Sequence, residues 1–350
     1  MTDIAAYAAK ADAWLQSVAG EFGSAARKGL SEAEDLALGR RYLKARFDAG
    51  YAADPKTGAI VAQKLCDMKV NGIVGHLNSG TTIPASRIYY DCGIPQITPS
   101  ATTPKVTQQG FESVFRVIAH DGVLGVALAK YAVNEVKAKR VVVIDDRTGY
   151  GQPLADIFVK QLQANGVKVL ERHYTNDKAT DFAAILTSVK RVNPDLVFYG
   201  GMDAQAGPML RQMNQLGMKA KFMGGDGICT TELIRLGGDN VGPNVMCAEG
   251  GMAVSKMPGG AAFEQRFKSR FKTDIQVYAP FVYDAVMTMG MAMKNAKSAD
   301  PKKYLPKLKD IRHDGVIGTI AFDEVGDVLN AAVTLNSYGP QGKFPVKIVN

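Results

Sequence analysis

Two clusters of small hydroxyl-bearing residues are the part of this sequence best suited to hold a ligand. Residues 78–82 (NSGTT) follow the apolar run 72–77, and residues 100–103 (SATT) follow the apolar run 94–98. Neither cluster contains a lysine, a set of metal ligands or a nucleophile paired with a base. Such hydroxyl and amide groups suit the binding of a small carboxylate better than chemistry on it. For either cluster alone, helix capping is the competing interpretation.

The two apolar runs have the length of strands, and residues 85–91 between them have the length of a short helix. This order predicts a βαβ unit with parallel strands. Both hydroxyl clusters then lie at the carboxyl edge of one sheet. Ligands bind at that edge in open α/β sheets, where helix N-termini present N–H groups and a positive dipole end to an anion.

The rest of the chain from residue 55 also alternates between strands and helices, which predicts an α/β fold. The run VVVID at residues 141–145 is typical of a parallel strand buried on both faces. Further strands are expected at 111–118, 167–174, 195–200, 221–224, 245–249, 319–322, 332–338 and 345–349. Helices are expected at 57–68, 121–137, 153–164, 181–192, 205–216, from 231, and at 261–271, 280–296 and 302–311. Residues 5–18 and 31–47 have the pattern of amphipathic helices.

Length and composition exclude several classes of protein. A chain of 350 residues predicts two domains. The net charge is +8, but the basic residues are scattered and form no stripe, so we expect no nucleic-acid partner. No apolar run reaches eighteen residues, which argues against a membrane span, and the first twenty residues do not have the pattern of a secretory signal.

The cysteine spacing and the absence of common enzyme motifs both bear on function. The four cysteines have no CxxC spacing, so we expect no zinc and no other metal or cofactor. Cys229 and Cys247 flank a short predicted helix, and both a disulfide and isolated buried thiols remain open for them. No strand is followed by GxGxxG, and neither GxxxxGK[ST] nor GxSxG occurs. We therefore expect a binding protein and not an enzyme.

Six segments resemble the periplasmic branched-chain amino acid (Leu/Ile/Val) binding proteins of ABC importers. In chain order they are VGHLNSGTTIPAS, IPQITPSATTP, VVVIDDRTGYGQPLAD, LVFYGGMDAQAGPMLRQ, FMGGDGICT and IGTIAFDEVGDV, and the likeness runs from about residue 52 to the end. The resemblance implies a type I periplasmic-binding fold. In that fold two doubly wound parallel-sheet lobes are joined by a three-stranded hinge and close on a ligand.

The resemblance also implies a set of ligand-binding residues. Ser79, and Thr102 with the backbone of Ser100 and Ala101, match positions that hold the carboxylate of an amino acid and share in binding its ammonium. Asp226 matches an acidic position that pairs with the ammonium, since a buried charge needs a partner. The other expected contacts are Tyr150, which closes over the ligand, Asp203 after a strand, and Tyr278 near the side-chain pocket. Core packing is an equal alternative for Tyr278 and Phe281, and His76 is expected to be a satisfied strand residue.

The family pattern also sets the expected domains. Lobe 1 is predicted to comprise residues 1–120 and 250–330, and lobe 2 residues 121–249 and 331–350. Crossings are expected near residues 119–121, 249–252 and 328–331. Family members begin with a central strand, whereas the first 50 residues here have helical sequence, which suggests a frameshifted, misassigned or replaced start.

The function implied by the resemblance is capture of a branched-chain or related amino acid for a membrane permease. We expect a monomer in the periplasm. An alternative is an amide or amino-acid sensor of the same fold that acts on a regulatory partner.

Overall fold

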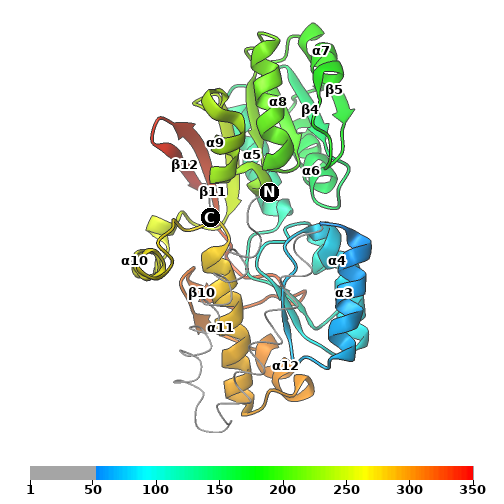
Figure 1. Cartoon of the computed structure of the whole chain (residues 1–350), viewed down its shortest axis with the longest axis vertical. Coiled ribbons are helices and arrows are strands. Elements are labelled where there is room, and N and C mark those ends of the chain that lie inside the picture. The colour runs from blue at the N-terminus through cyan, green and yellow to red at the C-terminus, as the bar shows by residue number, and fades with distance from the viewer. Residues whose placement is uncertain (1–52, 350) are drawn as a thin grey trace. The chain divides into compact units, whose positions relative to one another are not determined.

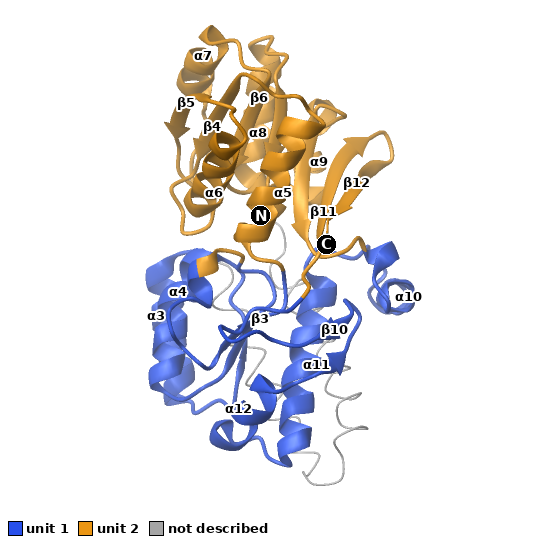
Figure 2. Cartoon of the chain, turned by 180° about the vertical axis from the view of Figure 1, so that it is seen from behind, with its two compact units in different colours: residues 1–101, 105–118, 254–329 blue, residues 102–104, 119–253, 330–350 orange. Residues whose placement is uncertain are grey.

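The computed structural model of the chain describes residues 53–349, so the helices expected at 5–18 and 31–47 lie outside the described residues. Contacts between residues divide the chain into two compact units (Figure 2). Unit 1 contains the described residues 53–101, 105–118 and 254–329. Unit 2 contains residues 102–104, 119–253 and the C-terminal segment from Asn330.

Unit 1 is built on a parallel sheet of three short strands, β1 (Ile73–Val74), β2 (Gln96–Thr98) and β3 (Val114–Arg116). Helices α3 (Pro55–Asp67) and α4 (Ser79–Asp91) pack against each other and bury an apolar cluster against this sheet. Helix α11 (Ala279–Ala296) contacts β1 and β2 from the opposite side (Figure 1). The unit is completed by η1 (Pro104–Val106, of which Pro104 is counted with unit 2), η4 (Val254–Lys256), α10 (Gly260–Phe271), α12 (Pro301–Lys309) and the hairpin of β9 (His313–Asp314) and β10 (Thr319–Ile320). The predicted βαβ unit is therefore confirmed.

The helix in that βαβ unit is longer than predicted. We expected it at residues 85–91, but α4 already begins at Ser79 and includes Pro84. The hydroxyls of Thr81 and Thr82 each donate to the Asn78 carbonyl oxygen at 2.8 Å. These bonds satisfy the Asn78 carbonyl oxygen at the N-terminus of the helix. Pro84 lies inside α4, so the rule that an interior proline breaks a helix does not hold here.

Unit 2 is built on a seven-stranded sheet with the order β12-β11-β8-β7-β6-β4-β5. Five strands are parallel: β4 (Val141–Asp145), β5 (Val169–Tyr174), β6 (Leu196–Gly200), β7 (Lys221–Gly224) and β8 (Val245–Gly250). The last two, β11 (Val333–Gly339) and β12 (Gly342–Val349), form a hairpin that adds to β8 in the antiparallel sense. The sheet is thus parallel with an antiparallel edge.

Helices cover both faces of this sheet, as a doubly wound fold requires (Figure 1). On one face lie α5 (Asp121–Asn134) and α6 (Gly151–Ala164), and on the other α7 (Ala183–Arg191), α8 (Asp203–Gln215), η2 (Asp226–Ile228), α9 (Thr231–Gly237) and η3 (Gly238–Asn240). Successive residues of β4 point to alternate faces. Val141 and Val143 therefore pack with α5 and α6, and Val142 and Ile144 with α7 and α8.

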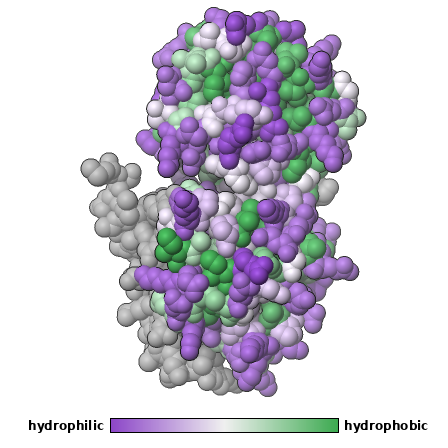
Figure 3. Space-filling model, turned by 90° about the vertical axis from the view of Figure 1, so that its right-hand side faces the viewer, coloured by the Kyte–Doolittle hydropathy of each residue, from purple (hydrophilic) through white to green (hydrophobic). Residues whose placement is uncertain are grey.

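Two disulfides are present. Cys66 and Cys92 join the C-terminal ends of α3 and α4, a pairing that we did not predict. Cys229 and Cys247 join the segment after η2 to β8, so the disulfide is the correct one of the two alternatives for this pair. On the face shown in Figure 3, hydrophilic residues predominate and apolar residues form islands among them. No helix within residues 53–349 is both long and apolar enough to cross a membrane.

Candidate ligand-binding site

The unit 2 sheet brings three of the predicted site residues to the ends of neighbouring strands. The chain leaves β4 toward β5 on one side, and the later strands β6, β7 and β8 follow on the other side. The strand order therefore reverses between β4 and β6, which is the topological switch point where α/β sheets bind ligands. Tyr150 follows β4, Asp203 follows β6 and Asp226 follows β7.

Tyr150 and Asp226 are in direct contact, and both are buried, with exposed fractions of 7% and 2%. The Tyr150 hydroxyl donates to Asp226 Oδ1 at 2.8 Å and accepts from the Gly227 N–H at 3.0 Å. A carboxylate held by a hydroxyl in a buried place has a defined orientation. Two residues that lie 76 positions apart in the chain are thus joined, and they place a carboxyl group at the edge of the sheet.

The loop that carries Tyr150 is shaped by Asp146. Its Oδ1 accepts from the Thr148 N–H at 2.9 Å and from the Thr148 hydroxyl at 2.7 Å. Burial raises the pKa of Asp146 to about 6. Helix α6 then begins at Gly151, two residues before the predicted start. A Cβ on residue 151 would overlap the carbonyl oxygen of Gly200. Glycine is therefore needed beside Tyr150, and the Asp-x-Thr pattern was the signal for this turn.

Asp203 has a different environment from Tyr150 and Asp226. It is the first residue of α8, and its Oδ2 accepts from the Thr230 hydroxyl at 2.6 Å. Thr230 also caps α9, because its Oγ1 accepts from the Leu233 N–H at 3.1 Å. Burial raises the pKa of Asp203. Asp203 thus ties α8 to the start of α9, and its predicted contact with a ligand remains a prediction.

Ser79 lies at the start of α4 in unit 1 and is 1% exposed. The residue before it, Asn78, has extended backbone but makes no side-chain cap hydrogen bond. An N-terminus of this kind, with the helix dipole directed along its 13 residues, is suited to an anion. Ser79 is thus the first residue of α4, and its predicted contact with the carboxylate of a ligand stays a prediction.

Ser100 and Ala101 follow β2, and hydrogen bonds within unit 1 engage most of their polar groups. The Ser100 hydroxyl donates to the Leu77 carbonyl oxygen at 3.0 Å and so links the two hydroxyl clusters. The Ala101 N–H donates to Thr98 Oγ1 at 3.0 Å, and the Ala101 carbonyl oxygen accepts from Arg116 Nη1 at 3.2 Å. These bonds fix the backbone of the second cluster.

Thr102, the next residue, is counted with unit 2 and is 1% exposed. Its carbonyl oxygen accepts from the Asp121 N–H at 2.8 Å, while its buried hydroxyl has no hydrogen-bond partner among the described residues. Tyr278 immediately precedes α11 in unit 1 and is half-buried. The more deeply buried Phe281 belongs to the first turn of the same helix.

His76 and Arg116 are buried polar residues of unit 1 that support these loops. His76 Nε2 lies 2.9 Å from the Tyr89 hydroxyl, and burial lowers the pKa of His76 to about 4, so the ring is neutral at pH 7. This agrees with the satisfied role that we expected. Arg116 was not predicted. Its guanidinium is fully buried and pairs with Asp327 at 2.6 Å, a contact between residues 211 apart that spacing does not reveal.

A two-unit α/β fold with polar groups at the carboxyl edges of parallel sheets is typical of solute-binding proteins. The sequence profile of the periplasmic binding protein family matches residues 7–337. This chain belongs to that family, which consists of solute-binding proteins and not enzymes.

Three similar proteins illustrate the match. The Leu/Ile/Val-binding protein homolog 1 of Brucella abortus is 35% identical over 283 residues, which cover 79% of this chain and 74% of the relative. An amino acid binding protein of Pseudomonas aeruginosa is 33% identical over 294 residues, 84% of this chain and 78% of the relative. The crystal structure of a leucine binding protein from Thermotoga maritima has a TM-score of 0.80 at 28% identity and covers 85% of each chain. The expected type I periplasmic-binding fold is therefore confirmed.

Proposed function

We propose that this chain is the substrate-binding protein of an ABC importer and captures leucine, isoleucine, valine or a related amino acid in the periplasm. Its similarity to Leu/Ile/Val-binding and leucine binding proteins supports this class of ligand. Family membership supports delivery to a membrane permease. In this proposal the ligand is taken up by two lobes that close on it, as in the family fold.

The observation that carries the proposal is the Tyr150–Asp226 pair. An amino acid brings an ammonium and a carboxylate, and burial of either charge is favourable only when an opposite charge or several donors receive it. Asp226 supplies a carboxylate that is 2% exposed, and the hydroxyl of Tyr150 orients it. This arrangement suits an ammonium.

The hydroxyl clusters supply the donors for the other charge of the ligand. We assign the carboxylate of the amino acid to Ser79 and the N-terminus of α4, where the dipole is favourable. The hydroxyl of Thr102 is a second candidate, because a buried hydroxyl that makes no hydrogen bond among residues 53–349 is suited to a ligand. Tyr278 and Phe281 at the start of α11 are the candidates for contact with the apolar side chain.

Isothermal titration calorimetry of the whole protein with leucine, isoleucine, valine, other amino acids and small amides tests the proposal. We expect saturable binding of at least one branched-chain amino acid. Asp226→Asn should weaken that binding about 100-fold, because loss of one partner of a buried charge pair costs about 2–5 kcal/mol. Asp239→Asn is the matched control, since Asp239 lies in η3 of the same unit and is exposed.

Two results contradict the proposal. One is a folded protein that binds none of these ligands, and the other is an Asp226→Asn variant that binds as tightly as the original chain. The role in transport has its own test, which is uptake of labelled leucine by membrane vesicles that contain the permease, with and without the purified protein. Uptake that does not depend on the protein would favour the sensor alternative.

A further inference from the structure

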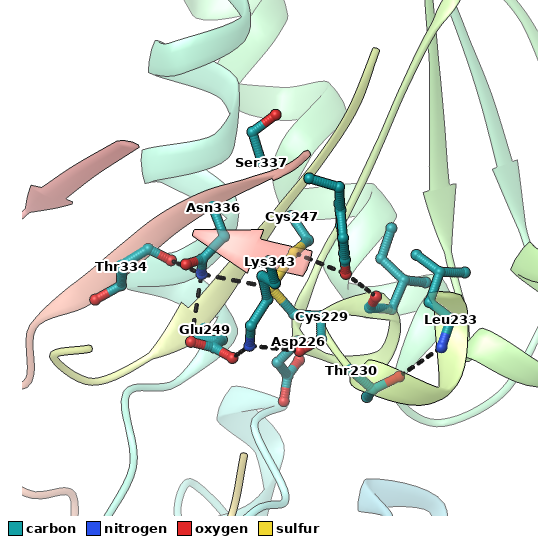
Figure 4. The surroundings of a disulfide bond; sticks show 12 residues. Asp226, Cys229, Thr230, Leu233, Cys247, Glu249, Thr334, Asn336, Ser337 and Lys343 are labelled. Atoms are coloured by element: carbon teal, nitrogen blue, oxygen red, sulfur yellow. Dashed lines mark hydrogen bonds and ion pairs between the residues drawn. A yellow bond between two sulfur atoms is a disulfide. The ribbon is translucent and has the colours of Figure 1, made fainter. Parts of the chain in front are cut away.

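We propose that Lys343, in the C-terminal hairpin, is a positioning residue for Asp226 and acts through the backbone of the segment that carries it. Together with Tyr338 and the Cys229–Cys247 disulfide it forms what we call the hairpin brace. The inference rests on the proposed function, because it concerns the carboxylate assigned to the ammonium of the ligand. Figure 4 shows the residues around the disulfide.

The segment after β7 has little secondary structure of its own. Asp226 begins η2, which has three residues, and Cys229 ends it by donating its N–H to the Asp226 carbonyl oxygen at 3.0 Å. A single short turn leaves its following carbonyl groups without helical partners. The Tyr150 hydroxyl orients the Asp226 carboxylate, and the position of the Asp226 backbone also depends on what holds residues 228 and 229.

The C-terminal hairpin supplies donors to both of these carbonyl groups. The Tyr338 hydroxyl on β11 donates to the Ile228 carbonyl oxygen at 2.8 Å. Lys343 Nζ on β12 donates to the Cys229 carbonyl oxygen, also at 2.8 Å. The two donors lie at least 110 residues along the chain from their acceptors. The carbonyl oxygens of two consecutive residues are thus held by side chains of the last two strands of the chain, β11 and β12.

The disulfide holds Cys229 from strand β8, which lies next to β11 in the sheet. Cys229 is bonded to Cys247 in the middle of β8, and Cys247 is paired in register with Asn336 of β11. The sulfur of Cys247 lies 3.5 Å from the Tyr338 hydroxyl. The covalent link and the two hydrogen bonds therefore meet within three residues of Asp226 (Figure 4).

Lys343 is itself held in place. Its ammonium pairs with Glu249 of β8, and the two side chains are 20% and 14% exposed. Glu249 Oε2 in turn accepts from Asn336 Nδ2 at 3.3 Å. Burial lowers the pKa of Lys343 to about 8, so its charge is kept at pH 7 at a desolvation cost. A largely buried ion pair is a poor source of stability compared with apolar packing, and a geometric role accounts better for a lysine here.

A neighbouring lysine offers a matched control. Lys347 lies on the same strand and pairs with Glu135 at 2.9 Å, but both of these side chains are 48% exposed. The brace predicts that Lys343→Met weakens leucine binding about tenfold or more, the effect of losing a charge-assisted hydrogen bond. Lys347→Met should leave leucine binding unchanged. Tyr338→Phe removes a single hydroxyl, keeps the ring, and serves as a second variant should Lys343→Met fail to fold.

Two measurements test the brace. The first is calorimetry with L-leucine on the original chain, each variant, and each variant combined with Asp226→Asn. If Lys343 acts by positioning the Asp226 carboxylate, Lys343→Met should weaken leucine binding much less in a chain that already carries Asp226→Asn. Comparison of the single and double variants in a double-mutant cycle measures this coupling. The second is hydrogen exchange of ligand-free protein, where the N–H groups of residues 226–230 should exchange faster in Lys343→Met and Tyr338→Phe than in Lys347→Met.

Each outcome decides one question. Unchanged leucine affinity in Lys343→Met and Tyr338→Phe overturns the brace, and so does an equal loss with and without the Asp226 carboxylate, which is a general structural effect. If the original chain binds no amino acid at all, the proposed function fails, and hydrogen exchange alone decides the brace. Equal exchange of residues 226–230 in Lys343→Met and Lys347→Met would then overturn it.

Discussion

The ion pair between Arg116 and Asp327 makes a strong prediction about the stability of unit 1. The Arg116 side chain is fully buried and that of Asp327 is 8% exposed. Asp327 Oδ1 accepts from Arg116 Nε at 2.9 Å, from Arg116 Nη2 at 2.6 Å and from the Thr107 hydroxyl at 3.0 Å. Asp327→Ala therefore removes the carboxylate and leaves a cation in the interior. Loss of one member of a buried pair costs about 3–5 kcal/mol.

This cost is a large part of the free energy of unfolding of a domain, which is about 5–15 kcal/mol. With an m-value of about 2 kcal/mol/M, the urea midpoint of unit 1 should fall by about 2 M. Urea unfolding at pH 7 followed by far-ultraviolet circular dichroism measures the midpoint. Hydrogen exchange read by mass spectrometry assigns the change to unit 1, which is necessary because a chain of two units need not unfold in one step.

Two comparisons make the interpretation specific. Asp91→Ala breaks the exposed pair of Arg87 and Asp91 on α4, whose side chains are 65% and 54% exposed, and should leave the urea midpoint nearly unchanged. The double change Arg116→Met with Asp327→Leu removes both charges and should recover most of the loss. The reasoning is refuted if Asp327→Ala costs less than about 1 kcal/mol, or if the double variant is no more stable than the single one.

Three further predictions concern other residues. The pKa of His76 falls from 6.5 to about 4 on folding, so between these pH values the unfolded chain binds a proton that the folded chain does not. The free energy of unfolding should therefore drop by up to about 3 kcal/mol as pH falls from 6.5 to 4. His76→Gln should flatten this part of a curve of stability against pH. Replacing Cys66 and Cys92 by serine opens a cross-link across 26 positions and should cost about 3–4 kcal/mol in urea unfolding, with leucine affinity unchanged. Gly151→Ala should cost about 1–3 kcal/mol by overpacking and, by displacing Tyr150, weaken leucine binding in calorimetry; a variant that melts and binds as the original chain does would contradict this.

How much could be predicted from the sequence depended on the range of the interactions. The strands at 141–145 and 221–224 were predicted with their observed bounds, because a β-branched run or a glycine turn marks each of them locally. The strand expected at 72–77 is shorter and spans only Ile73–Val74. Beyond it the backbone of His76 turns to accept hydroxyls from Thr82, Thr98 and Ser100, which no local pattern reveals.

In the candidate site, too, local patterns could be read from the sequence and long-range contacts could not. Ser79, Tyr150 and Asp226 could be named because each follows a predicted strand and because six segments resemble one family. The hydrogen bond that the Thr230 hydroxyl donates to Asp203 could not be foreseen, since it joins two helices through tertiary packing. The same holds for Lys343, whose acceptor lies 114 positions away, and no sequence rule connects the last strand to the residue after η2.

The division of the chain into interleaved segments has a consequence for biosynthesis. Unit 1 needs residues up to 329, and unit 2 needs the residues that follow, so neither unit is complete when the central β/α array emerges. A chain that stops at residue 329 would leave β8 as an open sheet edge, the kind of edge that promotes association between chains. Contacts between segments so distant in sequence also form slowly. Nascent chains should therefore stay partly unfolded until the final hairpin docks, which would give a chaperone time to act on them.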